Sequence, residues 1–391
     1  MRKLYLALLA LGLVVAGPVA AQDLITEKKV FELAEFKVQS GATLKNVKVG
    51  WESYGTLNAE KSNAILICHF FSASSHAAGK YAANDAAPGY WDAIIGPGKA
   101  IDTNRFYVLS SDTLVNLGAG DKTVTTTGPA SINPDTGRPY GMSFPIVTIR
   151  DFIEVQKKLV ESLGIQKLVM VAGPSMGALQ TYEWAATYPE MVGRIMPVIG
   201  FAEADANLVA WLDIWATPIR LDPKWNGGDY YDKEPPLAGL AQALKIVTMH
   251  AQHWQWADTV FGRKWAKEGE DPAKGFDKRY AVEAALDAAG AARAKTSDAN
   301  HFLYLVKANQ LFVAGGGTLA DGLKRIKAPV LLITQPEDLL FHPDGVKETL
   351  DGLRAGGAPV KHLTLEGTRG HLDGVLSMKQ VEKGIAEFLA N

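Results

Sequence analysis

The sequence predicts an α/β fold in which a mostly parallel sheet is covered by helices on both faces. Two observations lead to this prediction. Short, continuously apolar runs recur along the chain, as expected for strands that are buried on both faces, and helical patterns lie between several of them. Strands that alternate with helices form parallel sheets. The runs cover residues 64–68, 106–109, 168–172, 194–199, 330–334 and 360–365.

Two further patterns define the start of the chain and its clearest helix. Residues 30–38 and 42–54 alternate apolar and polar side chains, which predicts a leading antiparallel strand pair. A helix is predicted over 151–163, because apolar residues recur there at helical spacing. Thr148 and Asp151 have the spacing of a capping box that starts this helix.

The alternation of strands and helices stops between residues 203 and 323. This stretch is rich in helical patterns and holds six of the nine tryptophans. We interpret 203–323 as a helical cap inserted into a core formed by 22–202 and 324–391. Trp211 and Trp215, one helical turn apart, form either the interior of the cap or the wall of a substrate pocket, and the sequence leaves both readings open.

The N-terminus has the pattern of a secretory signal peptide over residues 1–21. Arg2 and Lys3 precede a short apolar run, and small residues follow it near Ala21. We therefore expect a secreted, periplasmic protein without a stable membrane anchor, since the apolar run is too short to span a bilayer comfortably. An uncleaved anchor is the alternative.

Composition excludes several classes of function. The 391 residues are 47% hydrophobic and 21% charged, with a net charge of −2 and no basic run, so no nucleic-acid partner is expected. The single cysteine, Cys68, cannot form an intramolecular disulfide and is predicted to be a buried core thiol. The eight histidines show no zinc-binding spacing, so no metal and no cofactor are assigned.

Residues 173–177, Gly-Pro-Ser-Met-Gly, fit the G-x-S-x-G nucleophile elbow. An apolar strand precedes them and a helix follows, which is the context that this motif requires. The glycines at ±2 are expected for steric reasons, because strand and helix pass closely at a strained serine. Ser175 is therefore the predicted nucleophile, exposed at the carboxyl edge of the sheet.

A serine nucleophile needs a base, and the base needs an acid that fixes its tautomer. In α/β-hydrolases these partners follow the serine in the order acid, then histidine, each on a loop after a strand. Asp338 follows the run 330–334 and His371 follows the run 360–365, so both stand at the expected places. Glu337 is the competing acid.

An oxyanion hole needs two backbone N–H groups that face the developing negative charge. The residue after the nucleophile, Met176, is expected to supply one of them. The second is expected from the loop after the strand 64–68, where we choose Phe71. His69 and His76 of this loop are not expected to be bases, since they precede the nucleophile strand.

Over nearly the whole predicted mature chain, the sequence resembles the homoserine O-acetyltransferase family of α/β-hydrolase proteins. The resemblance implies a Ser–Asp–His triad at Ser175, Asp338 and His371, which favours Asp338 over Glu337 as the acid. It also implies an acyl-enzyme mechanism, a helical cap and often a homodimer. The segments that carry it are 67–69, 91–106, 127–134, 144–151, 173–177, 222–225 and 228–231.

Two departures from this family concern the substrate. Members that act on homoserine carry an aspartate directly after the catalytic histidine, to hold the substrate ammonium, and an arginine in the cap for the carboxylate. Here Leu372 and Ala216 occupy these positions, and Asp373 lies one residue further on. The charges of an amino acid cannot be buried unpaired. We therefore assign Trp211, Trp215, Ala216 and Leu372 to a largely uncharged substrate pocket.

Together these features predict a cofactor-free serine ester hydrolase that acts on small, largely uncharged acyl esters. The family itself suggests the first alternative, an acyl-CoA-dependent O-acyltransferase. A non-catalytic binding protein that has kept the fold is the second. The expected partners are the ester substrate and a second copy of the chain.

Overall fold

A computed structural model of the chain describes residues 24–390. The predicted signal peptide, residues 1–21, lies outside the described residues. Among residues 24–390, no helix is long and apolar enough to cross a membrane.

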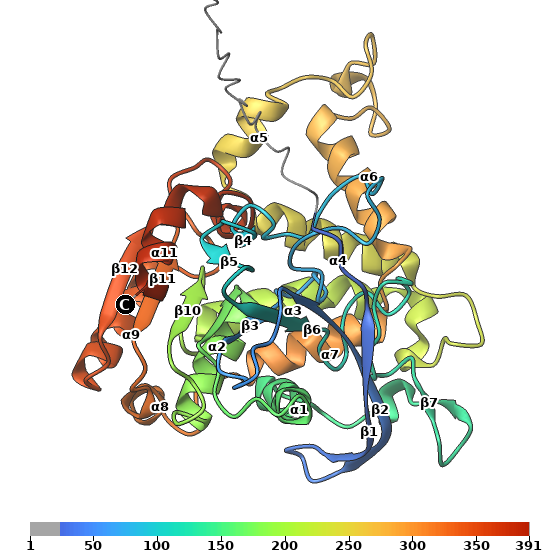
Figure 1. Ribbon diagram of the computed structural model, residues 1–391. Helices are drawn as coiled ribbons and strands as arrows, with labels where there is room; N and C mark the ends of the chain where they lie inside the picture. The colour runs from blue at the N-terminus through green and yellow to red at the C-terminus, as the bar shows by residue number, and fades with distance from the viewer. Residues whose placement is uncertain (1–23, 391) are drawn as a thin grey trace, which may run out of the picture.

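An eight-stranded sheet forms the centre of the fold (Figure 1). Its spatial order is β1-β2-β6-β3-β9-β10-β11-β12, and every neighbouring pair from β6 to β12 is parallel. The pairs β1/β2 and β2/β6 are antiparallel, which confirms the leading strand pair. The strands are β1 Lys29–Lys37, β2 Thr43–Tyr54, β3 Ala64–Cys68, β6 Tyr107–Ser111, β9 Met170–Pro174, β10 Ile195–Val198, β11 Val330–Thr334 and β12 Val360–Thr364.

Strand β9 lies two residues further along the chain than the predicted 168–172, and strand β6, predicted over 106–109, extends to Ser111. The last two residues of β6 are serines, which do not extend an apolar run. They pair with β2, where Ser111 lies opposite Trp51. Two small strand pairs lie outside the main sheet. They are β4 Ile95–Gly96 with β5 Ile101–Asp102, and β7 Ile132–Asn133 with β8 Arg138–Pro139.

Both faces of the sheet are buried at the inner strands β3, β9, β10 and β11, as their continuous apolar runs predict. The run 360–365 differs, because β12 lies at the edge of the sheet and none of its residues is fully buried. In β3, Ala64 and Leu66 belong to one hydrophobic cluster, whereas Ile65 and Ile67 belong to another. This alternation follows from the two-residue period of a strand. Helices α1, α2, α8 and α9 supply side chains to the first cluster, and α11 with the segment around Trp91 supplies the second. The α/β architecture is therefore confirmed.

Helix α1 covers Ile149–Ser162, so it begins two residues earlier than the predicted 151–163 and ends one residue earlier. Helix α1 begins after Thr148, whose hydroxyl and the carboxylate of Asp151 form the predicted capping box. The α-helices are α1 Ile149–Ser162, α2 Met176–Thr187, α3 Ala206–Leu221, α4 Leu237–His250, α5 Trp254–Val260, α6 Ala281–Ala294, α7 Ala299–Gln310, α8 Leu319–Arg325, α9 Pro343–Ala355, α10 Asp373–Leu376 and α11 Glu382–Ala390. The 3₁₀-helices are η1 Gly141–Ser143, η2 Pro223–Gly228, η3 Pro272–Lys274, η4 Gly370–Leu372 and η5 Met378–Val381.

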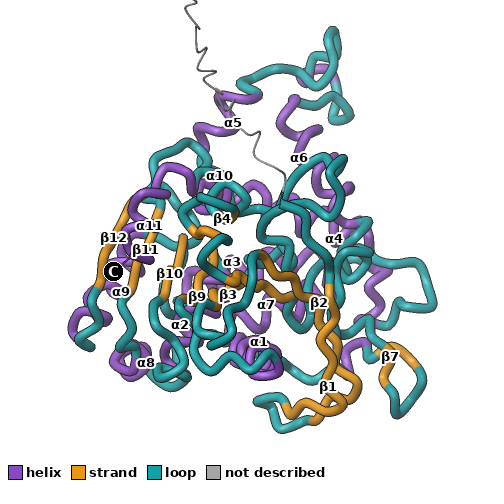
Figure 2. The backbone as a smooth tube through the Cα atoms, in the orientation of Figure 1, coloured by secondary structure: helices purple, strands orange, loops and turns teal. Residues whose placement is uncertain are grey.

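Helices α3 to α7 lie between β10 and β11 in the chain, where the sequence predicts the cap. Figure 2 shows β10, β11 and β12 side by side, with α4 and α6 on the opposite side of the molecule and α5 at its top. The predicted cap boundary at residue 323 falls inside α8. Leu323 packs closely on Gly352 of α9 and belongs to the core cluster, so α8 lies with the core helices. The division into core and cap stays a prediction.

Candidate active site

Ser175 lies at the sharp turn between β9 and α2. Its backbone has φ 57° and ψ −120°, a conformation that non-glycine residues rarely adopt. The flanking glycines make this turn possible. A Cβ on Gly173 would lie 2.4 Å from the carbonyl oxygen of Cys68, and a Cβ on Gly177 would lie 2.2 Å from the same atom. Strand β3 therefore passes so close to the elbow that only glycine fits at either position.

His371 and Asp338 are joined by a hydrogen bond at the carboxyl ends of neighbouring strands β12 and β11. His371 Nδ1 lies 2.7 Å from Asp338 Oδ2, and both side chains are buried. The other carboxylate oxygen, Oδ1, accepts from the backbone N–H groups of Leu340 at 2.8 Å and Phe341 at 3.2 Å. The Phe341 ring stacks on the imidazole at 5.6 Å. The carboxylate and the ring are therefore fixed from several sides.

Glu337, the alternative acid, faces a different histidine. Its Oε2 lies 2.8 Å from Nε2 of His253, which precedes α5, and its side chain is 58% exposed. The buried acid that contacts His371 is Asp338. The geometry therefore favours Asp338 for the acid role.

Phe71 and Met176 are the two residues chosen for the oxyanion hole. Met176 is the first residue of α2, and Phe71 lies three residues beyond the end of β3. Within residues 24–390, neither N–H donates to a backbone carbonyl or to a side chain. Buried N–H groups are rarely left without a partner, so this pair is available for a ligand oxygen.

The cap brings its tryptophans to this part of the core. Trp215 is buried, its ring lies edge-on to Phe71 at 5.6 Å, and its Nε1–H donates to His250 Nδ1 at 3.2 Å. Trp211 lies 4.0 Å from the ring of His250. Burial lowers the pKa of His250 to about 4. Trp215 is thus an interior residue that contacts the loop carrying Phe71, whereas the half-buried Trp211 contacts His250. The assignment of both to a substrate pocket stays a prediction.

Leu372 follows His371 directly, and its half-buried side chain is apolar. Its backbone N–H donates to Ala251 in the cap at 3.3 Å. The adjacent carboxylate, Asp373, is buried and turned into the protein. Its Oδ1 accepts from Ser377 Oγ at 2.7 Å, and its Oδ2 accepts from the backbone N–H of Arg369 at 3.1 Å. Asp373 therefore does not replace the aspartate that the family uses to bind an ammonium.

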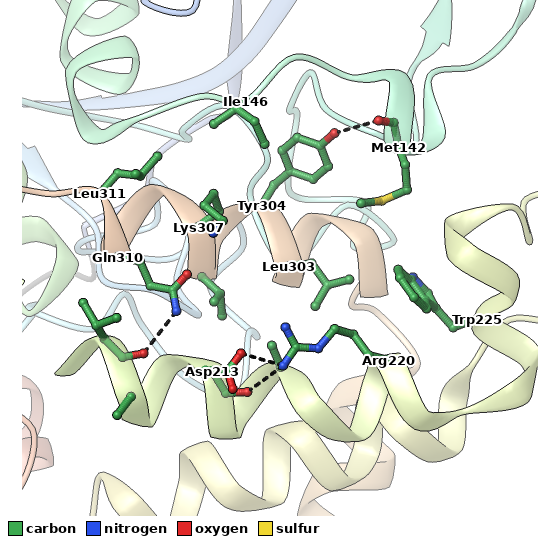
Figure 3. Close-up of a pocket in the computed structure, with 14 residues that line it drawn as sticks. Met142, Ile146, Asp213, Arg220, Trp225, Leu303, Tyr304, Lys307, Gln310 and Leu311 are labelled. Atoms are coloured by element: carbon green, nitrogen blue, oxygen red, sulfur yellow. Dashed lines mark hydrogen bonds and ion pairs between the residues drawn. The ribbon is translucent and has the colours of Figure 1, made fainter. Parts of the chain in front are cut away.

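Ala216 is not brought together with the other candidate residues. It lines a groove of about 610 Å³ between α3 and α7 that contains none of Ser175, Asp338 and His371 (Figure 3). In this groove Arg220 points toward Asp213 and donates to its carboxylate at 2.6 Å. Ala216 follows Trp215 in sequence, but consecutive helical residues point about 100° apart, so the two side chains face different surroundings. The assignment of Ala216 to the substrate pocket stays a prediction.

Gln180 is a buried residue of the site that the sequence analysis missed. Its Nε2 donates both to the backbone carbonyl of His69, at 3.1 Å, and to that of Met176, at 3.2 Å. The Gln180 side chain therefore joins the helix that carries Met176 to the loop that carries Phe71. The available signal was a glutamine one turn after Met176 in a helix whose other residues are mostly small or apolar.

Nothing in the described part of the chain resembles a metal site, because no three His, Cys, Asp or Glu side chains there could hold an ion. Cys68 is buried in the core, as predicted, and burial raises the pKa of its thiol. The structure thus offers a buried histidine–carboxylate pair, a serine at a strained turn and two backbone N–H groups that have no partner among residues 24–390. That these groups act together as a catalytic site stays a prediction.

Comparison with known proteins bears on the fold and the family of this chain. A family model described as the alpha/beta hydrolase fold matches residues 126–373. The homoserine O-acetyltransferase of Methanococcoides burtonii is 40% identical over 358 residues, which are 91% of this chain and 72% of that protein.

Two solved structures are similar over almost their whole length. Esterase E22 is 51% identical with a TM-score of 0.90, covering 93% of this chain and 100% of that one. The homoserine O-acetyltransferase from Bacillus anthracis is 37% identical with a TM-score of 0.89, covering 94% of this chain and 98% of that one.

Proposed function

Because this chain belongs to the homoserine O-acetyltransferase family of α/β-hydrolase-fold proteins, we propose that it uses the family's acyl-enzyme chemistry for ester hydrolysis. The proposed substrates are small, largely uncharged acyl esters. Ser175 is the nucleophile, His371 the base and Asp338 the acid that orients it. The similarity to esterase E22, which is 51% identical, supports the hydrolase over the transferase.

In this mechanism His371 Nε2 takes the proton of Ser175 Oγ while Oγ attacks the ester carbonyl carbon. Asp338 accepts a hydrogen bond from Nδ1–H at 2.7 Å, which leaves the lone pair on Nε2. The tetrahedral intermediate collapses, and His371 gives its proton to the departing alcohol. Water then attacks the acyl-enzyme with His371 again as base, which releases the acid and restores Ser175.

The N–H groups of Phe71 and Met176 are the proposed donors to the tetrahedral oxyanion. Their lack of other partners among residues 24–390 supports this role. Met176 is also the first residue of α2, so its N–H lies at the positive end of a helix dipole. Donors that are fixed in advance toward developing charge are worth several kcal/mol in acyl transfer.

The observation that carries the choice of substrate is the pair Leu372 and Asp373. The side chain of Leu372, directly after His371, is apolar. The carboxylate of Asp373 already accepts hydrogen bonds from the Ser377 hydroxyl and the Arg369 backbone N–H. A homoserine ammonium would therefore be buried here without the aspartate that family members use. An uncompensated buried charge costs roughly 3–5 kcal/mol. Such a penalty corresponds to roughly two to four decades in affinity.

An acyl-CoA-dependent O-acyltransferase is the second candidate. One specific observation favours it, namely the 40% identity to a protein named homoserine O-acetyltransferase. Both candidates share the acyl-enzyme and differ in the group that accepts the acyl chain. The hydrolase uses water, and the transferase uses the hydroxyl of homoserine.

The test supplies the purified protein with a short-chain ester alone and, in parallel, with millimolar acetyl-CoA and homoserine. The hydrolase is expected to release acid from the ester and to form no O-acetylhomoserine. Rapid O-acetylhomoserine formation with the ester untouched would overturn the proposal in favour of the transferase. Labelling by a fluorophosphonate, with Ser175→Ala as control, separates both enzymes from a non-catalytic binding protein.

Export to the periplasm and a homodimeric state are proposals that rest on the sequence alone. The signal-peptide pattern of residues 1–21 supports export, and the family resemblance supports a dimer. An exported enzyme would meet abundant water and, by this reasoning, no pool of acetyl-CoA. N-terminal sequencing of protein from a periplasmic fraction is expected to begin near Gln22.

A further inference from the structure

His69 is a fully buried histidine that takes no part in the proposed proton transfer. It begins the loop of residues 69–76, which follows β3 and contains Phe71. Its Nε2 lies 3.2 Å from the backbone N–H of Thr113, which can only donate. The proton of the neutral imidazole therefore sits on Nδ1. Nδ1–H then donates to the carbonyl oxygen of Phe70 at 2.8 Å. Burial lowers the pKa of His69, which keeps the ring neutral.

This hydrogen bond acts on the peptide unit that contains the Phe71 N–H. The Phe70 carbonyl and the Phe71 N–H belong to one planar trans peptide, so they point in opposite directions. Fixing the oxygen toward the His69 ring therefore fixes the N–H toward the other side. If the peptide turned over, the loop would present a carbonyl oxygen where an N–H donor is required.

We propose that His69 is a positioning residue for the oxyanion hole, because its Nδ1–H holds the Phe70–Phe71 peptide with the Phe71 N–H toward the reacting carbonyl. This inference rests on the proposed function, in which Phe71 is one of the two oxyanion donors. His69 itself touches no substrate atom in this scheme.

The surroundings of His69 hold it and the loop in one place. The Asn116 side-chain amide contacts His69 Nε2 at 3.2 Å and donates to the Ala73 carbonyl at 3.0 Å. Gln180 donates to the carbonyl of His69 and to that of Met176. The buried Gln180 side chain therefore fixes the positions of the Phe71 loop and the start of α2 relative to each other.

The far end of the loop is anchored separately from the Phe71 peptide. The backbone N–H of Ser75 donates to Asp112 Oδ1 at 2.7 Å, and its hydroxyl donates to Glu52 at 3.0 Å. His76 Nδ1 lies 2.9 Å from the same Glu52 carboxylate. This second anchor supplies a matched control, since His76 is a histidine of the same loop and, within residues 24–390, makes no hydrogen bond to the Phe70–Phe71 peptide.

The test compares His69→Leu and His69→Asn with the parent protein. Leucine fills part of the space but cannot donate, whereas the short asparagine amide can still reach the Phe70 carbonyl. The readout is kcat/KM for 4-nitrophenyl acetate divided by kcat/KM for the matching thionoester, in which sulfur replaces the carbonyl oxygen. Sulfur is the weaker hydrogen-bond acceptor, so this ratio reports on the oxyanion donors and not on folding alone.

His69→Leu is expected to lower kcat/KM for the oxygen ester about 10- to 100-fold, less than the roughly 10²- to 10³-fold kcat loss on removing a donor outright. The thionoester rate should change much less, so the ratio falls, and His69→Asn should lie between Leu and the parent. A trifluoromethyl ketone, which forms a hemiketal oxyanion, gives a second measurement. The Ki of this ketone should rise, and the fold increase should equal the fold decrease in kcat/KM for the oxygen ester.

In the control, His76→Leu is expected to lower the melting temperature and to leave the rate ratio and the ketone Ki unchanged. An unchanged ratio and Ki in folded His69→Leu would overturn the proposal, as would equal changes in His76→Leu. If Ser175→Ala retained full activity, the proposed function itself would fail. That outcome is distinguishable, because it concerns the nucleophile and not the rate ratio.

Discussion

Replacing Asp338 by asparagine is expected to block proton transfer while leaving the shape of the site intact. Asp338 Oδ1 accepts two backbone N–H groups, from Leu340 and Phe341, and Oδ2 faces His371 Nδ1. The asparagine amide has one oxygen, and two donors compete for it at the Oδ1 position. Its NH₂ group must therefore face Nδ1, which forces the histidine proton onto Nε2. In that tautomer His371 cannot accept the proton of Ser175.

The corresponding loss in kcat is about 10⁴-fold, the value typical of a wrong histidine tautomer in a triad, or about 5 kcal/mol in activation free energy. The assay is steady-state hydrolysis of a short-chain ester, with the melting temperature measured in parallel. Glu337→Gln is the matched control. Its amide oxygen can still accept from His253 Nε2, and the side chain is 58% exposed, so kcat should stay near that of the parent. Strong loss in Glu337→Gln with a mild effect in Asp338→Asn would refute the reasoning.

Three further predictions concern the nucleophile, the buried charges and the elbow. Ser175→Ala should lower kcat by on the order of 10⁶ with little change in melting temperature, since the Cβ is kept. Burial raises the pKa of Glu52, but hydrogen bonding by His76 and the charge of Lys28 outweigh it and lower that pKa to about 2. The stability that Glu52 contributes, about 3 kcal/mol, is thus present above its unfolded pKa, near 4.5, and lost as pH falls toward 2. Urea unfolding at pH 7, 4.5 and 3 should show a smaller acid loss in Glu52→Gln, and an equal loss would contradict this. Gly177→Ala should lower the unfolding free energy by about 1–3 kcal/mol, since the added Cβ meets backbone, and parental stability in the same urea assay would contradict this.

The fold and the proposed triad could be predicted because their signals are local. The inner parallel strands, such as β3 and β11, are short apolar runs because both of their faces are buried, whereas the edge strand β12 is partly exposed and carries Lys361 and His362. The elbow is marked by Gly173 and Gly177, which the contact with β3 requires. Asp338 and His371 then follow from chain order, because the carboxyl ends of parallel strands meet at one edge of a sheet.

The rest depends on orientation, which sequence position does not fix. Ala216 and Trp215 are neighbours in sequence, yet one lines the α3–α7 groove and the other adjoins Phe71. Asp373 lies one residue beyond the position of an ammonium ligand, and only the contacts of its carboxylate reveal that it faces inward. Gln180 belongs to no recognisable sequence motif, because its hydrogen-bond partner His69 lies 111 residues earlier in the chain.

The contacts that hold Asp338 against His371 differ from those that bring Trp215 to Phe71. Asp338 and His371 are held by each other and by the loop that contains Leu340 and Phe341, all of which belong to the sheet edge. The cap reaches the same edge through different residues, among them Trp215 against Phe71. Changes at Trp215 are therefore expected to alter the surroundings of Phe71 while the hydrogen bond between Asp338 and His371 stays in place. Changes at Ala251 or His253 would differ, because these residues contact the loops that carry His371 and Asp338. Substitution of Trp215 would thus test whether the choice of acyl acceptor can change while the proposed triad is kept.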